Sequence, residues 1–495
     1  MEVITYRYLI AFALHHGLSM HQMDIVTAYL YGNLDKTIYM EAPPELIARV
    51  AYYSQGEHKR KQSIQNSESS FGHTDEDKLK SISRMIQWQA DSLRPADHAL
   101  TAKRKFSVQV FRSMYGLKQS GRTWYHRFHT EMIAMGFSNS EIAPCVFIKR
   151  EGKELMIVAI YVDDLNMFGT NKIMLETIKL LKRSFEMRDM GKTTFCLGLQ
   201  FEHLHDGVLL HQSTYTKRIL KQFNMLNVKT VRSPMDLRSL DKDKDIFRKR
   251  EEQEPLLGSE KPYLSAIRAL LFLSNQTRPD ITFAVSLLAR HSSQPTIRHW
   301  NGLKRIFCYL SGTADLGLYY PKHTDWTLVG YADAGYLSDP ADAKSQTGYV
   351  FQMGPTAISW WSTKQTLATT SSNHSEIIAL YEASRECLWL RNLIDHISDS
   401  AGMQKLNFPA VIFEDNRSCV EQITSGFIKG EKTKHIAPKF FFAHEQNGHQ
   451  MNVQWIASSD NTADLLTKPL PPAVHETHSY SMGLRSLTKL LQEAK

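Results

Sequence analysis

An acidic turn separates two apolar runs in the stretch Leu155-Met-Ile-Val-Ala-Ile-Tyr-Val-Asp-Asp-Leu-Asn-Met-Phe168. Apolar runs of this length on either side of a short turn predict two strands joined as a hairpin. The turn carries Asp163 and Asp164, and like charges this close repel each other unless a cation neutralises them. A hard divalent cation, Mg²⁺ or Mn²⁺, is the natural partner of such oxygen ligands, although Asp also favours turns that bind nothing.

The composition indicates a globular intracellular protein. The 495 residues are 42% hydrophobic and 22% charged, and the formal net charge of +8 weakly favours a polyanionic partner. Five Cys without a C-x-x-C pair indicate a reducing compartment and no structural zinc. No apolar run approaches the ~20 residues of a membrane helix, and no signal peptide is apparent. We therefore expect a soluble protein without membrane contact.

Helical and extended segments alternate along the chain, which predicts a mixed α/β (α+β) fold. Residues 54–105 are rich in Ser, Gln, Lys and Glu and show no persistent period, so we expect a disordered insertion there. Residues 236–262 carry mixed charge and are expected to form a linker. The expected helices span 4–16, 121–135, 171–185, 263–275, 280–291, 296–311 and 374–396. The expected strands span 22–26, 38–40, 146–148, 195–201, 208–212, 327–332, 347–353, 357–361 and 410–414.

A third carboxylate, Asp24, ends a predicted strand in His21-Gln-Met-Asp-Ile-Val-Thr-Ala-Tyr29. This stretch resembles the first catalytic motif of copia-type retrotransposon reverse transcriptases, and the acidic hairpin resembles their catalytic hairpin. The resemblance implies that Asp24, Asp163 and Asp164 are the metal triad of a polymerase that holds two ions about 4 Å apart. It also implies that Tyr29 is the aromatic gate against a ribonucleotide's 2′-hydroxyl. Otherwise Tyr29 would be read as a core tyrosine.

Further motifs follow in the order of the same family. Ser113-Met-Tyr-Gly-Leu-Lys-Gln-Ser-Gly-Arg-Thr-Trp-Tyr125 resembles the motif that packs against template and nucleotide, which implies that Gln119 lies near the nucleotide. Ser120-Gly121 stands there in place of the commoner Ala-Pro. Phe195-Cys-Leu-Gly-Leu-Gln200 resembles the primer-grip hairpin, which implies that Leu197 and Gly198 approach the primer end. Three stretches resemble the family's connecting region: Thr277-Arg-Pro-Asp-Ile281, His299-Trp-Asn-Gly302 and Tyr309-Leu-Ser-Gly-Thr-Ala-Asp-Leu-Gly-Leu318.

Four more carboxylates are spread over the last third of the chain. Asp333 and Asp415 are expected at strand ends, Glu376 in the first turn of a long helix, and Asp464 at the start of a C-terminal helix. Taken singly, an Asp at a strand end is common in loops, and a Glu in a first turn stabilises the helix dipole. In this order the four resemble the ribonuclease H of copia-type elements, which implies that all four are catalytic metal ligands.

The resemblance implies an RNA-directed DNA polymerase with ribonuclease H activity, using two Mg²⁺ or Mn²⁺ ions in each active site. The implied partners are an RNA template, a DNA primer, an RNA–DNA hybrid and dNTPs, and the oligomeric state is not indicated. The implied location is a cytoplasmic virus-like particle or the nucleus. The expected domains are a right-hand polymerase palm with partial thumb (1–235), the linker (236–262), a helical connection (263–325) and a ribonuclease H-like domain (326–485).

The chain begins just before the first helix, where relatives carry the basic fingers strands that hold the triphosphate. We therefore expect a fragment of a polyprotein with weak or absent DNA synthesis. One alternative is a truncated or decayed remnant that binds nucleic acid without polymerising. Another is a host-adopted binding protein that uses the same scaffold.

Overall fold

The computed structural model describes residues 2–43, 107–139, 141–322, 325–406, 409–426 and 436–493. The expected disordered insertion, 54–105, lies outside these residues. The chain divides into two compact units, each described by itself below: the first comprises Met1–Met23, Ser138–Lys179 and Asp189–Lys495, and the second comprises Asp24–Phe137 and Leu180–Arg188. Helices and strands both contribute substantially, which confirms the mixed α/β class.

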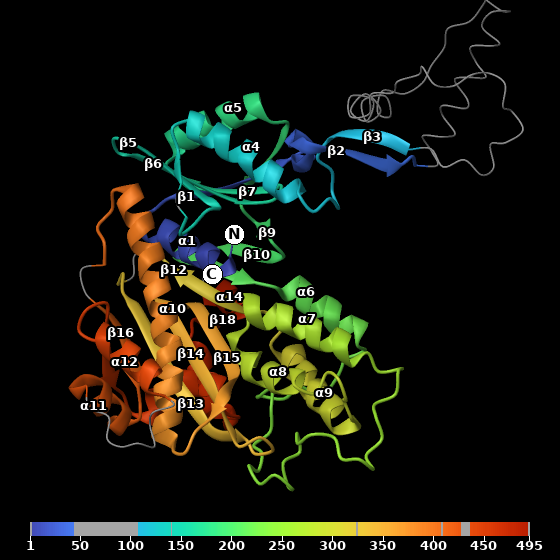
Figure 1. Ribbon diagram of the computed structural model, residues 1–495, viewed down its shortest axis with the longest axis vertical. Helices are drawn as coiled ribbons and strands as arrows, with labels where there is room; N and C mark the ends of the chain where they lie inside the picture. Colours follow the sequence, from blue (N-terminus) through green and yellow to red (C-terminus); the bar gives the residue numbers. More distant parts are fainter. Residues whose placement is uncertain are drawn as a thin grey trace, which may run out of the picture. The chain divides into compact units, whose positions relative to one another are not determined.

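The helices are named as in Figure 1. Their bounds are α1 (Val3–His15), α4 (Ser120–Ala134), α5 (Asn171–Ser184), α6 (Ser213–Gln222), α7 (Tyr263–Gln276), α8 (Thr282–Ala289), α9 (Ile297–Gly312), α10 (Ser372–Ala401), α11 (Arg417–Ser425), α12 (Ala437–Gln446), α13 (Pro472–Ser481) and α14 (Leu487–Glu493). Short 3₁₀ helices are η1 (Ala28–Tyr31), η3 (Pro279–Ile281), η5 (Ser458–Asp460) and η6 (Thr462–Leu466). No helix in the described part of the chain is both long enough and apolar enough to span a bilayer.

The first sheet contains the predicted acidic hairpin. Tyr161 pairs with Asp164 in an antiparallel ladder, so the turn has two residues and the hairpin prediction is confirmed. The strands flanking the turn are almost completely buried, because both faces of this part of the sheet are covered. The strand order is β4 (Ser138–Asn139), β5 (Val146–Glu151), β6 (Glu154–Tyr161), β7 (Asp164–Gly169), β1 (Ser19–Ile25) and β8 (Met187–Lys192).

The second sheet joins distant parts of the sequence. Val208 pairs with Tyr320, and Leu318 pairs with Leu484, so strands from three separate regions form one antiparallel ladder. The predicted hairpin over residues 195–212 forms its other edge. The strand order is β18 (Leu484–Ser486), β12 (Leu316–Pro321), β11 (Gly207–His211), β10 (Leu199–His203) and β9 (Phe195–Cys196).

The third sheet has three antiparallel strands followed by two parallel ones, and α10 packs across it against β13 and β14 (Figure 1). The strand expected over 327–332 is longer than predicted, so Asp333 lies within β13 instead of ending it. The antiparallel partner continues to pair as far as Gly335 and, past a bulge, at Asp339. The strand order is β15 (Thr356–Ala368), β14 (Lys344–Met353), β13 (Leu328–Asp339), β16 (Ala410–Glu414) and β17 (Met451–Trp455).

Helix α1 is fastened to the third sheet by a buried arginine. The Arg7 guanidinium lies 3.9 Å from the centroid of the Trp360 ring, and its Nε donates to the carbonyl oxygen of Ile358 at 2.7 Å. Its Nη1 donates to the carbonyl oxygens of Asn275 and Gln276, at 2.9 Å each. These bonds compensate the desolvation of the charge, so α1 forms part of the core around the third sheet.

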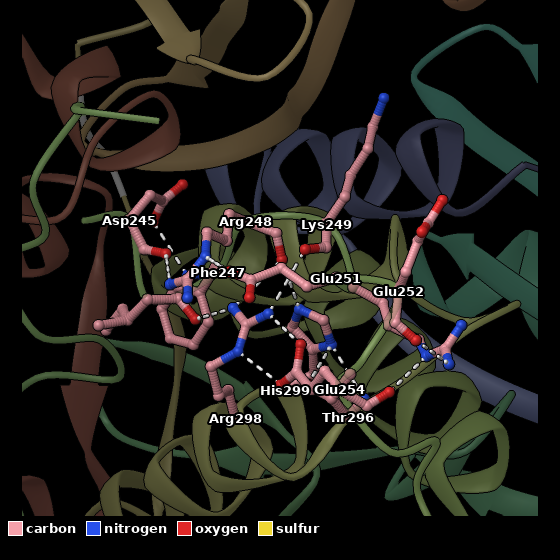
Figure 2. A network of polar contacts seen from close by, with 12 residues as sticks. Asp245, Phe247, Arg248, Lys249, Glu251, Glu252, Glu254, Thr296, Arg298 and His299 are labelled. Atoms are coloured by element: carbon pink, nitrogen blue, oxygen red, sulfur yellow. Dashed lines mark hydrogen bonds and ion pairs between the residues drawn. The ribbon is translucent and has the colours of Figure 1, made fainter. Parts of the chain in front are cut away.

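The charged segment 236–262 contains no helix or strand, yet it packs against the start of α9. Figure 2 shows Arg298 and His299 directed at its backbone. Arg298 Nη1 donates to the carbonyl oxygen of Ile246 at 2.8 Å, and His299 Nε2 lies 3.0 Å from that of Arg248. The Nδ1 atom of His299 accepts from the Thr296 N–H, which makes Nε2 the protonated nitrogen. The segment is therefore held against α9 by hydrogen bonds to its backbone.

The second unit contains a two-stranded ribbon, β2 (Asn33–Glu41) with β3 (Ser107–Arg112), together with η1 and α4. An aromatic cluster holds the helix in place. The ring of Trp124 lies 6.0 Å from that of Tyr31 and 5.4 Å from that of Phe185. These buried rings provide the apolar area that this small unit needs.

Candidate active sites

Three of the four predicted nuclease carboxylates lie together. Asp333 comes from β13, Glu376 from α10 and Asp415 from the residue after β16, and their nearest oxygens all lie within 4.8 Å of one another. Glu376 was expected in the first turn of its helix, but α10 begins at Ser372 and Glu376 follows the first turn. Asp333 is 2% and Glu376 6% exposed, so both are withdrawn from water. The Ser371 hydroxyl accepts the backbone N–H of His374 and fixes the start of α10, which orients Glu376 towards the sheet.

The fourth carboxylate, Asp464, joins the cluster through a lysine. Lys468 Nζ lies 2.6 Å from Asp464 Oδ1 and 4.0 Å from Asp333 Oδ1. The neighbouring Thr467 hydroxyl donates to Asp333 Oδ2. Asp464 lies in η6, where a regular C-terminal helix was expected; the helix there is a 3₁₀ turn of five residues.

Burial and mutual repulsion disfavour the charged form of these carboxyls. Desolvation, followed by the charges of Glu414 and Asp333, raises the pKa of Glu376 well above its usual range. Desolvation and Asp333 raise the pKa of Asp415, and the same two causes raise the pKa of Asp464 to about 8. An added positive charge would stabilise the ionised form of all of them.

A further acidic residue, Glu414, was not predicted. It is completely buried, and burial raises its pKa well above the usual range. Its side chain shares the buried face of β16 with Ala410 and Ile412, so strand alternation alone would have directed it inward. The backbone N–H of Asn416 donates to one of its oxygens at 3.1 Å.

The donor set fits a divalent cation. All ligands are carboxylate oxygens, which suit hard cations such as Mg²⁺ and Mn²⁺. Glu376 Oε2 is buried and has no hydrogen-bond partner among the described residues, and buried acceptors of this kind usually have one. Asp333, Glu376 and Asp415 are the residues that would hold the ion, with Asp464 and Glu414 beside them.

The acidic hairpin has a strained backbone conformation at its turn. Val162 has φ +55°, a left-handed conformation that is costly for a β-branched residue. This turn presents Asp163 and Asp164 next to each other at the end of β6 and the start of β7. Gln22 of β1 donates from Nε2 to Asp164 Oδ1 at 3.3 Å, which restrains that carboxylate.

Three predicted polymerase residues belong to the second unit: Asp24, Tyr29 and Gln119. Asp24 lies in β1, and its approach to the hairpin carboxylates stays a prediction. Tyr29 lies in η1 with its ring 4.5 Å from that of Tyr115, a residue of the predicted nucleotide motif. Gln119 precedes α4 as its N-cap residue and is half-buried. Their roles at a nucleotide also stay predictions.

The predicted primer-grip hairpin forms a tight turn. Leu197 and Gly198 connect β9 and β10 with φ values of 53° and 79°, the combination found in two-residue type I′ turns. A Cβ on Gly198 would lie 3.2 Å from Cζ of Phe272, so the absence of a side chain allows close packing on α7.

Comparison with known families gives one match in the first half of the chain. Residues 93–237 match the family described as reverse transcriptase (RNA-dependent DNA polymerase). The matched range includes Gln119, the acidic hairpin and the Leu197–Gly198 turn.

Similar proteins match the chain over nearly its whole length. The Retrovirus-related Pol polyprotein from transposon TNT 1-94 of Nicotiana tabacum is 28% identical over 491 residues, which cover 98% of this chain and 32% of that protein. The corresponding polyprotein from transposon RE2 of Arabidopsis thaliana is 27% identical, over 97% of this chain and 28% of that protein. The chain thus spans about a third of the length of these relatives. Among solved structures, LC11-RNase H1, isolated from compost by a metagenomic approach, covers 29% of this chain and 93% of its own at 20% identity, with a TM-score of 0.22.

Proposed function

Because this chain is homologous to the Pol polyproteins of copia-type retrotransposons and carries a reverse transcriptase domain, we propose that it is an RNA-directed DNA polymerase with ribonuclease H activity. The ribonuclease H part of this proposal rests on the close approach of the carboxylates of Asp333, Glu376 and Asp415. Three carboxylates are unfavourable together in a low dielectric, and a fold that holds them there is arranged for cations.

In the nuclease, Asp333, Glu376 and Asp415 would hold Mg²⁺ or Mn²⁺, two ions per site, with Asp464 at the rim. Such ions lower the pKa of water and neutralise charge on a phosphodiester. The chain's own contribution is rigidity. Asp333 lies within a paired strand, Glu376 lies on a capped helix, and the Thr467 hydroxyl fixes one oxygen of Asp333. The substrate would be the RNA strand of an RNA–DNA hybrid.

In the polymerase, Asp163 and Asp164 would hold two cations together with Asp24, while Tyr29 and Gln119 contact the incoming dNTP. Leu197 and Gly198 would let the backbone approach the DNA primer on an RNA template. The strained Val162 supports this proposal, because backbone strain of this kind collects at functional sites and here brings two carboxylates to the tip of a buried hairpin. The compartment would be a virus-like particle in the cytoplasm, or the nucleus.

The nuclease proposal is tested with the full chain and a hybrid labelled on its RNA strand. We expect cleavage that requires Mg²⁺ or Mn²⁺ and falls by at least about 10³-fold in Asp333→Asn. The matched control is Asp399→Asn, since that carboxylate is exposed and pairs with Lys405. Metal-independent cleavage, or equal cleavage by Asp333→Asn, would contradict the proposal. Tight hybrid binding without cleavage would favour the alternative of a nucleic-acid-binding remnant.

The polymerase half is tested separately by primer extension on an RNA template with dNTPs. We expect weak or absent extension, and any extension should be abolished by Asp163→Asn while hybrid cleavage stays unchanged, because the two sites use different carboxylates. Extension that survives Asp163→Asn would remove the hairpin from the proposed site.

A further inference from the structure

A partly open cavity of about 80 Å³ lies where segment 238–249, the end of α8 and the β13–β14 turn meet. A cavity needs only roughly 10–15 Å³ of such volume to hold one water, so this one has room for a tetrahedral oxyanion. Cations outnumber carboxylates in its lining. Five cationic side chains, Arg238, Arg248, Lys249, Arg290 and Lys364, face two carboxylates, Asp245 and Asp339.

Arg238 leaves a buried donor unused in this cavity. Its side chain is 1% exposed, its Nη1 lies 2.8 Å from Asp245 Oδ2, and its Nη2 donates to the carbonyl oxygen of Ser338. The remaining Nε–H is buried and has no hydrogen-bond partner among the described residues. A buried N–H group without an acceptor is unfavourable, and an oxygen of a bound anion would satisfy it.

The two carboxylates are already engaged by the protein. Asp245 Oδ1 accepts the backbone N–H of Phe247 at 3.0 Å, and its other oxygen accepts Arg238. Asp339 Oδ2 accepts both Lys364 Nζ at 3.0 Å and Arg290 Nη1 at 3.2 Å. Two carboxylates outside the lining also contribute, since Asp342 pairs with Lys249 and Lys364, and Glu251 pairs with Arg248. Four carboxylates thus balance most of the charge of the five cations and leave one positive charge in excess.

Arg290 carries a charge that its surroundings do not fully compensate. Burial lowers the pKa of its guanidinium to about 10, although Asp339 acts in the opposite direction, and neighbouring Arg238 lowers the pKa further. Guanidinium groups that converge with a lysine are the arrangement that proteins use for tetrahedral oxyanions with several acceptor oxygens.

We propose that this cavity binds a phosphate group, either from the backbone of a nucleic acid or as a free ion. Its position favours the first source. Asp339 of the cavity and Asp333 of the carboxylate cluster lie on the same strand, β13, six residues apart, or at most roughly 20 Å at the usual rise of a strand. A nucleic-acid strand bound at the carboxylates extends further than that.

The first arm of the test measures thermal unfolding of the full chain in inorganic phosphate and in chloride at equal ionic strength. We expect a saturable rise of the melting temperature in phosphate for the natural chain. Lys364→Gln and Arg248→Gln should reduce this rise, since each removes a half-exposed cation from the cavity. Lys244→Gln is the matched control, because Lys244 lies in the same segment, is 77% exposed and does not line the cavity. No saturable effect in the natural chain, or an equal effect in all four chains, would overturn the proposal.

The second arm identifies the source of the phosphate. Binding of a labelled RNA–DNA hybrid is measured against salt concentration in EDTA, where cleavage cannot interfere. If the backbone supplies the phosphate, Lys364→Gln should reduce the slope of log K against log salt by about 0.9, and Lys244→Gln should not. An unchanged slope together with the phosphate effect of the first arm assigns the cavity to the free ion. The first arm uses neither hybrid nor divalent cations, so its result does not depend on the nuclease proposal, whose failure would be seen separately in the cleavage assay.

Discussion

Lys468 places its ammonium 2.6 Å from a carboxylate oxygen of Asp464, inside the acidic cluster of the third sheet. The same ammonium lies 4.0 Å from Asp333 Oδ1. Burial opposes its charge, yet Asp333 and Asp464 together raise its pKa above the usual value. Lys468 is therefore an internal counter-charge for carboxylates that otherwise repel one another.

Replacing Lys468 by Gln should destabilise the chain in the absence of divalent cations. We expect a loss of about 1–2 kcal/mol in the free energy of unfolding, less than for a fully buried pair because the lysine side chain is 40% exposed. Millimolar Mg²⁺ should stabilise this variant more than the natural chain, since the ion then supplies the missing charge. Denaturant unfolding with and without Mg²⁺ measures both effects. Equal Mg²⁺ stabilisation in both chains would contradict the counter-charge role.

Trp455 restrains the backbone of Asp415. Its indole Nε1–H donates to the Asp415 carbonyl oxygen at 3.0 Å, and the Arg417 guanidinium lies 4.2 Å from the ring centroid. Trp455→Phe keeps an aromatic ring but removes the hydrogen bond to Asp415, which contributes about 0.5–1.5 kcal/mol. We therefore expect hybrid cleavage to slow by up to about tenfold. Trp361→Phe is the control, because that exposed tryptophan lies on β15. A rate equal to the control would show that Asp415 does not depend on this bond.

A buried ion pair lies just before α8 and accepts a hydrogen bond from α9. Arg278 Nη2 lies 2.7 Å from Asp280 Oδ2, which also accepts the Tyr309 hydroxyl at 2.6 Å. Asp280→Asn should cost about 3–5 kcal/mol, because it leaves a buried guanidinium uncompensated. Arg278→Met combined with Asp280→Leu should recover part of this loss. Thermal or denaturant unfolding measures both, and Glu476→Gln, which breaks the exposed pair with Arg232, should change little.

The stacked imidazoles of His291 and His299 should make stability fall in mild acid. Their ring centroids are 3.9 Å apart, and burial, followed by the charges of His299 and Arg290, lowers the pKa of His291 to about 3. An unfolded histidine has a pKa of about 6.5, so between about pH 6.5 and pH 3 the unfolded chain binds the proton that the folded chain excludes. The free energy of unfolding should therefore decrease as the pH is lowered through this window. His291→Gln should flatten that dependence, and an unchanged slope would assign it to other groups.

Local patterns in the sequence predicted the acidic hairpin well, because the apolar runs on both sides of Asp163 specify strands without help from distant residues. The length of β13 was not predictable in this way. It depends on pairing with β14, which follows it across a turn and continues past Asp333. The same holds for segment 236–262, where the charge pattern indicated a mixed-charge linker and did not reveal that Arg238 and Asp245 neutralise each other inside the fold. A run of charged residues does not show which of them form ion pairs in the folded chain.

Two residues beside the carboxylate cluster could have been predicted from local sequence patterns, although they belong to none of the family motifs. Glu414 alternates with buried Ala410 and Ile412, and Lys468 follows Asp464 at the i,i+4 spacing of a helical ion pair. The meeting of Asp333, Glu376 and Asp415 came from the order of motifs in a family, since no spacing rule brings residues this far apart together. Their roles in catalysis remain for the variants above to test.

The second sheet limits how such chains can recombine. Strand β11 ends at His211 and its neighbour β12 begins at Leu316, and β12 in turn pairs with β18 at the far end of the chain. A crossover between two related genes in the sequence that separates these strands would combine β11 from one parent with β12 from the other. The two strands would then have to pair in one hydrogen-bonded ladder. Matching side chains would then have to be inherited from both sides of the breakpoint. The segments before β11 and after β12 should accordingly be exchanged together, or only between parents whose β11 and β12 have matching side chains.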